Sequence, residues 1–320
     1  MFVSQAALVF GAAALTAAAP LEKRGGITDD VILNYALTLE HLEDTFYREG
    51  LAKYSEQDFA NAGFDSTFYA NIKRVSSDES DHVSFLTTAL KAAGATPVAA
   101  CEYDFGYDSL QTFLATASIL EGVGVSAYLG AAADIMSKAY LTAAGSILTV
   151  EARHSSYIRG GLKQVPFAQP FDAPLSYNEV FSLASGFIKS CPETNPALPV
   201  KAFPALAADT SSGDAIKAGS TVTLLTPVRK PPNSNGLPFL LVEEADTPVQ
   251  EYTLKGGKVY AAFIAVTGPV FVDATPVEGG FTVKIPEGFA GQTYVVLTGC
   301  KDFVTDDTVA AGPAIIEISS

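Results

Sequence analysis

Residues 146–160 read SILTVEARHSSYIRG and place Glu151 three residues before His154. The same Glu-x-x-His spacing occurs earlier in the chain, at Glu79 and His82. Residues three apart on a helix share one face, with Cβ atoms about 5–6 Å apart, so a carboxylate and an imidazole at this spacing can reach one ion. The chain contains three histidines, and two of them lie in these motifs.

Each motif follows a glutamate on an earlier apolar segment, Glu40 before the first and Glu121 before the second. This order is what a four-helix bundle requires in order to hold two metal ions in its core. Four carboxylates balance two divalent ions, whereas without metal some of them would have to take up protons in an apolar core. Mixed Glu/His ligation suits iron or manganese, and zinc is also compatible. We therefore predict a site for two divalent ions, with a glutamate of each motif bridging them, formed by Glu40, Glu79, His82, Glu121, Glu151 and His154.

The first helix offers two candidate glutamates, Glu40 and Glu43. Tyr47 follows Glu40 by seven residues, and Tyr128 follows Glu121 by the same interval. Two helical turns place each tyrosine on the face of its glutamate, where its hydroxyl can hydrogen-bond a ligand carboxylate as an outer partner. The alternative is that both tyrosines are plain core aromatics. The repeated offset favours Glu40 as the ligand, and we interpret Glu43 as a solvated or capping residue.

Three polar neighbours of these motifs are given no ligand role. His41 is interpreted as an exposed neighbour of the ligand, not as a third imidazole ligand. Asp78 and Asp81 are interpreted as exposed charges, although one of them could orient His82, as carboxylates often do for metal-bound imidazoles.

Helical periodicity predicts four long helices and a shorter fifth one. Gly94 and Pro97 end the second helix, and Gly160 stops the fourth. The predicted helices span residues 28–54, 66–93, 109–133, 138–160 and 177–190.

The third predicted helix, residues 109–133, carries one charged residue, Glu121, at its midpoint. A run of about 20 apolar residues is long enough to cross a membrane. The run is nevertheless rich in Ser, Thr, Gln and Gly and lacks basic flanks. A central glutamate is also costly in lipid and natural in a bundle core. We therefore predict no transmembrane segment.

The composition changes to Pro, Ala, Ser and Thr over residues 191–219, which indicates a linker. Beyond it, short β-branched or aromatic runs separated by Gly and Pro predict a small antiparallel β-sandwich over residues 220–320. No catalytic triad, metal-ligand cluster or phosphate-binding loop occurs there, so we interpret this domain as structural or partner-binding. The predicted strands are residues 221–226, 238–242, 258–266, 270–273, 281–285, 293–298 and 315–319.

The chain has 320 residues, of which 48% are apolar and 17% charged, with a net charge of −15. Basic residues are sparse and unclustered, which argues against a nucleic-acid partner. The first residues form a short apolar run followed by small residues, as in a secretory signal, and Lys23-Arg24 resembles a dibasic propeptide site. We predict that residues 1–24 are a signal and propeptide, and that the bundle occupies residues 25–190 of a secreted protein.

Three cysteines in a chain predicted to be secreted suggest one disulfide and one remaining thiol. Cys101 and Cys191 both fall in predicted loops at helix ends, so we predict that they pair. Cys300 ends a predicted strand and would remain free.

The Glu-x6-Tyr and Glu-x-x-His duplication resembles the ferritin-like superfamily. More closely, residues 28–190 are similar to the secreted fungal ferritin-like proteins known as stress-response or late-sexual-development proteins, which are related to plant desiccation proteins. The resemblance implies a diiron or dimanganese centre that meets dioxygen or peroxide, as in ferroxidases, rubrerythrins and manganese catalases. It is carried by YALTLEHLEDTFYREGL (residues 35–51), ILEGVGVSAYLGAA (residues 119–132) and SILTVEARHSSYIRG (residues 146–160).

These observations predict an α+β multidomain protein, a ferritin-like four-helix bundle with a short fifth helix followed by a small antiparallel β-sandwich. The first functional hypothesis is an extracellular or wall-associated dimetal oxidoreductase of the ferroxidase, peroxidase or catalase type. The alternative is a non-enzymatic stress or developmental structural protein, in which the metal only stabilises the bundle. In that case the sandwich would dock onto the cell wall, another protomer or a partner protein. A scaffold without any cofactor is the third hypothesis.

Overall fold

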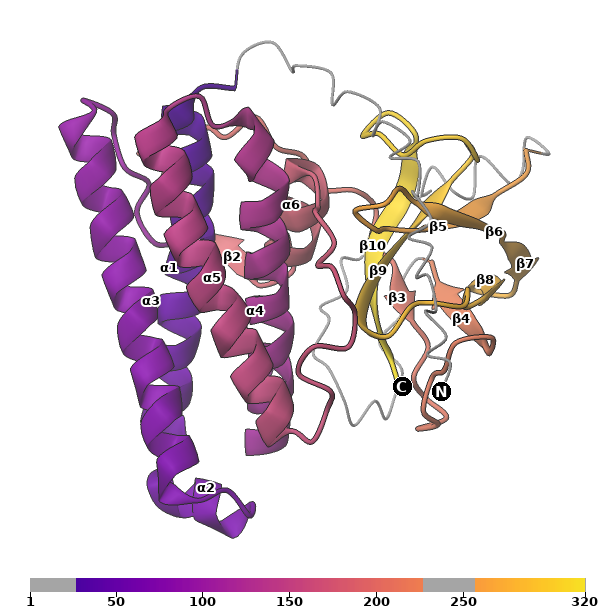
Figure 1. The fold of residues 1–320 in the computed structure, drawn as a ribbon, viewed down its shortest axis with the longest axis horizontal. Helices are drawn as coiled ribbons and strands as arrows, with labels where there is room; N and C mark the ends of the chain where they lie inside the picture. Colours follow the sequence, from indigo (N-terminus) through magenta and orange to yellow (C-terminus); the bar gives the residue numbers. More distant parts are fainter. Residues whose placement is uncertain (1–26, 227–256, 320) are drawn as a thin grey trace, which may run out of the picture.

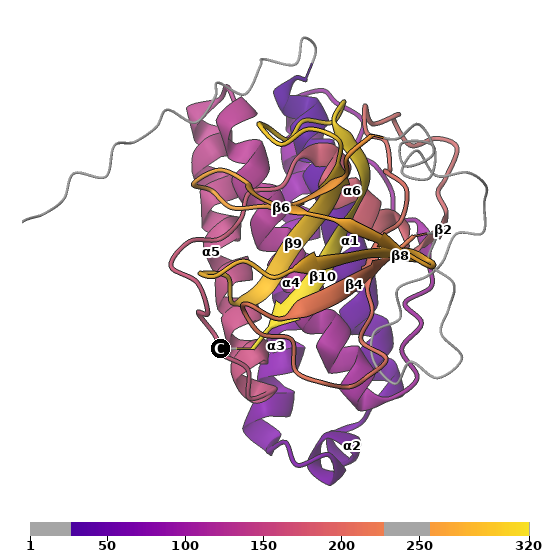
Figure 2. The same cartoon turned by 90° about the vertical axis from the view of Figure 1, so that its right-hand side faces the viewer.

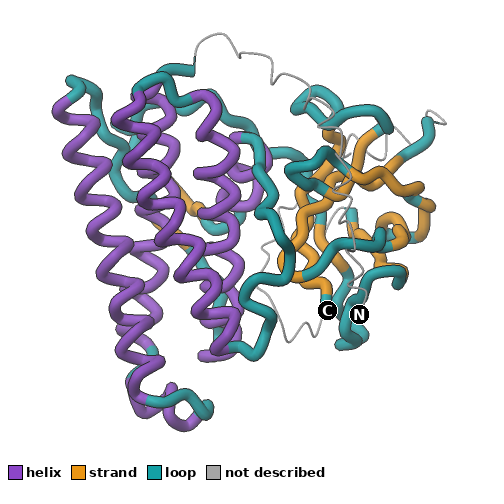
Figure 3. The backbone as a smooth tube through the Cα atoms, in the orientation of Figure 1, coloured by secondary structure: helices purple, strands orange, loops and turns teal. Residues whose placement is uncertain are grey.

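The computed structural model describes residues 27–226 and 257–319, a helical half followed by a half built of strands (Figure 1). The two halves separate clearly when the backbone is coloured by secondary structure (Figure 3). The predicted class, a helical bundle followed by antiparallel sheets, is confirmed. The predicted signal and propeptide, and the strand predicted at residues 238–242, lie outside the described residues.

Four long helices form the bundle, and their ends fall within two residues of the predicted ones. One helix of six residues was not predicted, because it is too short to show a periodic pattern. The helices are α1 (Asp29–Lys53), α2 (Glu56–Asn61), α3 (Ser66–Ala92), α4 (Leu110–Ala131), α5 (Lys138–Gly161) and α6 (Tyr177–Ser185), with a 3-10 turn, η1 (Ala132–Asp134), after α4.

The fifth predicted helix is shorter than expected. It was predicted to reach residue 190, but α6 ends at Ser185 and is followed by strand β2 (Ile188–Ser190). This strand pairs antiparallel with β1 (Glu102–Tyr103), so its backbone bonds to another segment and cannot continue the helix. The predicted disulfide between Cys101 and Cys191 is confirmed and joins the ends of this two-stranded ladder.

The bundle consists of two closely packed helix pairs, α1 with α3 and α4 with α5. By length and composition, the segment Leu110–Asp134 could cross a membrane, but 72% of its most apolar window is buried inside the protein. Its apolar character is therefore accounted for by the bundle core, which it shares with α1 and α6.

In the described residues of the second half, 207–226 and 257–319, two four-stranded antiparallel sheets share one apolar core. One sheet has the order β10-β9-β5-β6 and the other the order β3-β4-β8-β7. Short β7 was not predicted. The strands are β3 (Ala207–Ala208), β4 (Thr221–Leu225), β5 (Tyr260–Phe263), β6 (Val270–Asp273), β7 (Thr275–Val277), β8 (Gly280–Lys284), β9 (Gly291–Thr298) and β10 (Val309–Ile318).

The segment predicted as a linker, residues 191–219, is more ordered than a tether. It contributes strand β3 to the second sheet, and Leu206 lies in the apolar core of the sandwich. Nearby, the backbone N–H of Phe203 donates to the hydroxyl of Ser182 on α6 at 2.8 Å. A composition rich in Pro, Ala and Ser indicated a linker, but composition does not report these long-range backbone bonds.

The sheet that contains β9 packs directly against the bundle. Figure 2, viewed from the side of the strands, shows β9 and β10 in front of the helices. Gln292 donates to the carbonyl oxygen of Ile119 at 3.2 Å. The hydroxyl of Tyr294 donates to the carbonyl oxygen of Gly122 at 2.9 Å. A Cβ on Gly122 would lie 2.5 Å from Gln292 Oε1, so a side chain there would displace the Gln292 amide from this position. The sandwich therefore supports α4 at the residue next to Glu121.

An ion pair joins α5 to β10 at the same interface. The guanidinium of buried Arg159 makes two contacts with the Glu317 carboxylate, at 2.9 and 2.7 Å. Arg159 also donates to the carbonyl oxygen of Val165 at 3.0 Å. Bidentate pairs of this kind fix orientation as well as distance.

We expect Glu317→Gln to lower the free energy of unfolding by about 1–2 kcal/mol, because buried Arg159 loses its charge partner. The matched control is Asp273→Asn, which breaks the exposed contact between Lys258 and Asp273 at 2.8 Å and should leave stability unchanged. Urea denaturation of both variants measures the difference. Equal effects would show that the interface pair contributes no more than a surface pair.

Candidate metal centre

The six predicted ligand residues come together in the middle of the bundle, and all four long helices contribute. They are Glu40 on α1, Glu79 and His82 on α3, Glu121 on α4, and Glu151 and His154 on α5. The four glutamates have no exposed surface, and each histidine is less than one tenth exposed. Four buried carboxylates around one point require cations or protons.

The ligand atoms of these residues form two overlapping groups. One group comprises Glu40, Glu79, His82 and Glu151, and the other comprises Glu79, Glu121, Glu151 and His154. Within each group, one ligand atom from every residue lies within 4.8 Å of the others. Glu79 and Glu151 belong to both groups, as bridging carboxylates between two ions would. The cluster could therefore hold metal ions.

Both imidazoles direct Nδ1 toward the carboxylates. The oxygens 3.2 Å from His82 Nδ1 belong to Glu40, Glu79 and Glu151. His154 Nδ1 lies 3.0 Å from Glu79 Oε1. His82 on α3 thus contacts Glu151 of the second motif, and His154 on α5 contacts Glu79 of the first. The antiparallel arrangement of α3 and α5 permits both contacts.

Several buried polar atoms of the cluster make no hydrogen bond of acceptable geometry, even where an imidazole nitrogen lies close to a carboxylate oxygen, as His154 Nδ1 does to Glu79 Oε1. They are Glu79 Oε1, Glu121 Oε2, both carboxylate oxygens of Glu151, and His154 Nδ1. Leaving a buried polar atom unpaired is costly, and a divalent ion would pair all of these atoms. The donor set of carboxylates and imidazoles suits iron or manganese. The residues present therefore fit such ions.

Burial and repulsion between neighbouring carboxylates raise the pKa of Glu79 and of Glu151. Burial raises the pKa of Glu79 from 4.5 to about 7, although contacts with His154 and His82 oppose the rise. Burial, followed by repulsion from Glu79, raises the pKa of Glu151 well above its ordinary value.

The two imidazoles respond in the opposite sense to the same surroundings. Burial lowers the pKa of His154, but contacts with Glu121 and Glu79 outweigh it and raise the pKa to about 11. Burial likewise opposes charging of His82, yet its carboxylate neighbours raise its pKa far above the ordinary value. Protonated imidazoles can therefore replace part of the positive charge that metal ions would supply, and metal binding must displace those protons.

The two tyrosines contact ligand carboxylates across the bundle. The Tyr47 hydroxyl donates to Glu121, and the Tyr128 hydroxyl donates to Glu40. Each tyrosine thus contacts the glutamate of the other helix of the pair α1 and α4. It does not contact the glutamate seven residues before it, because seven residues span about 10 Å along a helix axis. Burial, reinforced by the adjacent glutamate, holds the pKa of both tyrosines well above the ordinary value, so both remain donors.

Asp78 contacts the centre through His154, and not through His82 as the sequence suggested. Its carboxylate lies 3.3 Å from His154 Nε2, and Arg74 contacts the same carboxylate at 2.7 Å. Asp78 on α3 contacts a residue of α5, and the sequence of α3 alone does not reveal this contact between helices. Carboxylates in this position orient a metal-bound imidazole. Asp81 is exposed, as predicted.

Glu43 is the residue that the sequence interpretation placed wrongly. It is 4% exposed instead of solvated. Burial, followed by repulsion from Glu151, raises its pKa well above the ordinary value. A Cβ built on Gly124 would lie 3.1 Å from Glu43 Oε1 and 2.9 Å from Glu151 Oε2. A fifth carboxylate therefore lies beside the centre, in space left by a glycine.

A sequence signal for this arrangement exists. Glu43 lies three residues after Glu40, and Gly124 lies three residues after Glu121. Glu43 on α1 and Gly124 on α4 therefore occupy equivalent positions in the duplicated pattern. The large side chain on α1 is matched by a glycine on α4, which leaves room for it.

We expect Gly124→Ala to weaken metal binding about tenfold, because its Cβ must displace the carboxylates of Glu43 and Glu151. The matched control is Gly145→Ala on α5, where a Cβ would meet nothing within 4 Å. That substitution should stabilise the protein by about 0.5–1 kcal/mol through helix propensity. Metal titration and thermal unfolding of both variants test this. Unchanged metal affinity in the Gly124 variant would contradict the packing argument.

His41 does not join the centre. It is half-buried, and its Nε2 lies 3.1 Å from the carbonyl oxygen of Val98. Burial lowers its pKa. Its side chain belongs to the contact between α1 and the segment after α3, so it is neither a ligand nor a fully exposed neighbour.

Comparison with known proteins agrees with this geometry. Residues 28–164 match the family model of the ferritin-like domain. The helical half contains a ferritin-like domain. Over 174 residues, 54% of this chain, the protein is 28% identical to "Protein rds1" of Schizosaccharomyces pombe. The aligned region covers 42% of that relative, so the similarity spans less than half of its length. In this chain the ferritin-like domain contains all six predicted ligand residues.

Proposed function

We propose that the ferritin-like domain binds two divalent ions, iron or manganese, and reacts with dioxygen or peroxide. The observation that supports this is the sharing of Glu79 and Glu151 between two four-residue groups with unpaired ligand atoms. When bound, such a pair of ferrous ions supplies two electrons, converting dioxygen and two protons to hydrogen peroxide, or hydrogen peroxide and two protons to two waters.

The side chains of this chain have separate tasks in that reaction. Glu79 and Glu151 hold the two positions together. Glu40 and Glu121 each belong to one of the two four-residue groups. A tyrosine hydroxyl fixes one carboxylate oxygen of each, that of Tyr128 on Glu40 and that of Tyr47 on Glu121. Each four-residue group would hold one ion, which would supply the electrons for reaction with a small oxidant. The surrounding apolar core excludes bulk water.

The test begins with elemental analysis of protein purified from its native host, because recombinant expression can load the wrong ion. Two ions per chain are expected. Metal-free protein is then loaded anaerobically with ferrous ion and mixed with dioxygen or with hydrogen peroxide, and oxidation is followed by absorbance and by peroxide yield. Stoichiometric metal with no reaction toward either oxidant would favour the structural alternative, in which metal only stabilises the bundle.

We also propose that the protein acts outside the cell. Two features support this: the predicted secretory signal over the first residues, and the disulfide between Cys101 and Cys191, a bond that persists in oxidising compartments. N-terminal sequencing of protein from the culture medium is expected to begin at Gly25. The face of the sandwich that is turned away from the bundle would then be the surface for a cell-wall or protein partner. Retention of the full-length protein in cell lysate would contradict this assignment.

A further inference from the structure

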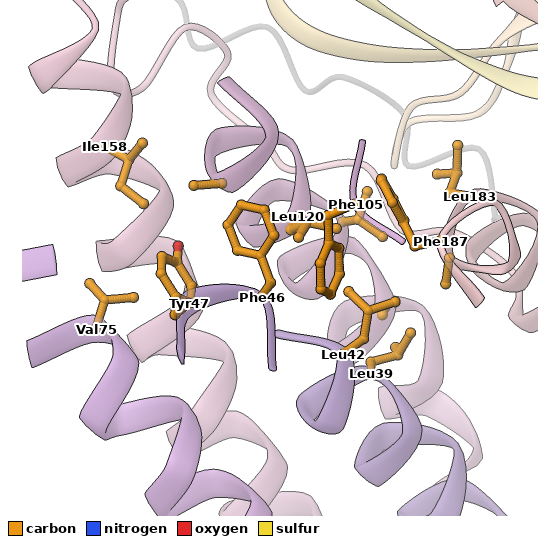
Figure 4. Close-up of a cluster of buried hydrophobic side chains, with 14 of the residues drawn as sticks. Leu39, Leu42, Phe46, Tyr47, Val75, Phe105, Leu120, Ile158, Leu183 and Phe187 are labelled. Carbon is orange, nitrogen blue, oxygen red and sulfur yellow. The ribbon is translucent and has the colours of Figure 1, made fainter. Parts of the chain in front are cut away.

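A small apolar cavity lies beside the candidate metal centre, where α1, α4 and α6 meet. Its volume is about 20 Å³. Side chains from these elements gather around it, and Figure 4 shows several of them in the surrounding cluster. The wall includes the hydrocarbon side chains of Leu39, Leu42, Leu120, Leu183 and Phe187.

One carboxylate lines this cavity, that of Glu43. Among the residues that the structure describes, no hydrogen-bond partner of Glu43 is found. Glu43 Oε1 and the Glu151 Oε2 of the predicted bridging ligand both lie within 3.1 Å of the position of a Cβ on Gly124. Gly124 also lines the cavity. The cavity therefore reaches Glu43 and Gly124, and an oxygen of the predicted bridging ligand Glu151 lies 2.9 Å from the Cβ position on that glycine.

The size and lining restrict what can occupy this space. A volume of this size holds about one water-sized molecule, and a buried water needs about two to four polar partners. The Glu43 carboxylate is the one charged or hydrogen-bonding side chain in the wall. Apolar cavities of proteins remain dry and accept apolar atoms such as xenon. A small apolar molecule is therefore favoured over water, over a hydrated ion and over hydrogen peroxide, whose two hydroxyl groups each need an acceptor.

We propose that this cavity admits dioxygen to the centre from the side of α1, α4 and α6, and that Glu43 forms its inner end. This rests on the proposed function and assigns its oxidant, dioxygen and not peroxide. The two histidines come from α3 and α5, so dioxygen approaches from the face of the centre that lacks imidazoles.

A second apolar cavity in the bundle provides an internal control. It is lined by Ile32, Phe85, Tyr128 and Ala131 among others, has the same volume of about 20 Å³, and no carboxylate lines it. Tyr128 separates it from Glu40, to which the tyrosine hydroxyl donates. If apolar gases merely fill any void in the bundle, both cavities will behave alike.

The experiment combines xenon binding with oxidation kinetics of the full chain. Ala184→Leu fills the cavity that ends at Glu43, and Ala131→Leu fills the control cavity. Xenon-pressurised crystals of the metal-free protein should show xenon beside Glu43 in the wild type and in Ala131→Leu, but not in Ala184→Leu. In ferrous-loaded protein, Ala184→Leu should slow oxidation by dioxygen about tenfold while oxidation by hydrogen peroxide stays the same. Ala131→Leu should react with dioxygen like the wild type.

Leu183→Ala enlarges the same cavity and does not require the core to accept extra volume, so it tests the assignment if Ala184→Leu fails to fold. It should increase xenon occupancy beside Glu43. The proposal is overturned if xenon enters only the control cavity, or if filling either cavity slows the reaction with dioxygen equally. A third outcome separates this proposal from the proposed function. If xenon binds beside Glu43 but the metal-loaded protein does not react with dioxygen, the proposed function is refuted, and the cavity is still shown to bind an apolar molecule.

Discussion

Glu151→Gln is expected to change stability in opposite directions with and without metal. Glutamine keeps the volume of glutamate but removes the charge, so the bridge between the two groups is lost. With metal at about one hundred times its dissociation constant, the stabilisation lost is about 3 kcal/mol. The metal-free variant should instead be more stable than metal-free wild type at pH 8, because burial and repulsion from Glu79 disfavour the ionised carboxylate.

The measurement is urea denaturation of both proteins with and without ferrous or manganous ion, together with the number of ions bound. The expected stoichiometry falls from two to one or none. Asp81→Asn is the matched control, since it removes an exposed negative charge from α3 without touching the centre. A Glu151 variant that keeps two ions would exclude the bridging assignment. Stabilisation that is equal in both conditions would favour a scaffold without metal.

Metal-free protein is expected to lose stability as the pH rises from about 4.5 through 7. The pKa of Glu79 is about 7 in the folded state against 4.5 ordinarily. Between these values the folded protein holds a proton that the unfolded chain has released, so raising the pH favours unfolding. The contribution from this one residue is about 3 kcal/mol over that interval.

His154 acts with the same sign over a higher interval. Its pKa rises from 6.5 to about 11 on folding, so its contribution is complete below pH 6.5 and is lost as the pH rises toward 11. Metal changes the trend. Metal ions need deprotonated ligands, so the stabilisation by metal increases over the pH range in which the metal-free protein weakens.

Denaturation of metal-free and metal-loaded protein at pH 5, 7 and 8 tests this expectation. The two stability curves should diverge with rising pH. Glu79→Gln removes one titrating group and should reduce the decline of the metal-free protein between pH 4.5 and 7. Metal-free stability that stays constant or increases over that interval would show that these carboxylates are not held protonated by the fold.

Much of the helical architecture could be predicted from local sequence. The spacing of Glu79 with His82 and of Glu151 with His154 depends only on helix geometry, which places residues three apart on one face. The helix ends also follow from local signals, such as Ser109, whose side chain caps α4. Several short strands of the second half were recognised for the same reason, because alternation and turn residues are local properties, but β3 and β7 were not predicted and β10 begins six residues before the predicted start.

The errors concern residues whose surroundings come from distant parts of the chain. Glu43 looked solvated because nothing next to it in sequence covers it, yet α4 buries it and Gly124 makes room for its carboxylate. Asp78 contacts His154 on another helix. The segment after Ser185 changes from helix to strand because it pairs with residues 102–103. Local pattern carries no information on such contacts.

The sequence by itself determined which side chains could meet a metal ion, because helical periodicity alone aligns each Glu-x-x-His pair. It also determined the order of a helical half and a β half. Only the tertiary structure decided that Tyr47 and Tyr128 each support the opposite helix's glutamate, that a fifth carboxylate lies beside the centre, and that one sheet packs on α4. Those features depend on how the helices and sheets approach one another. Close packing and the cost of burying unpaired charge determine these contacts, and both act only when the whole chain has folded.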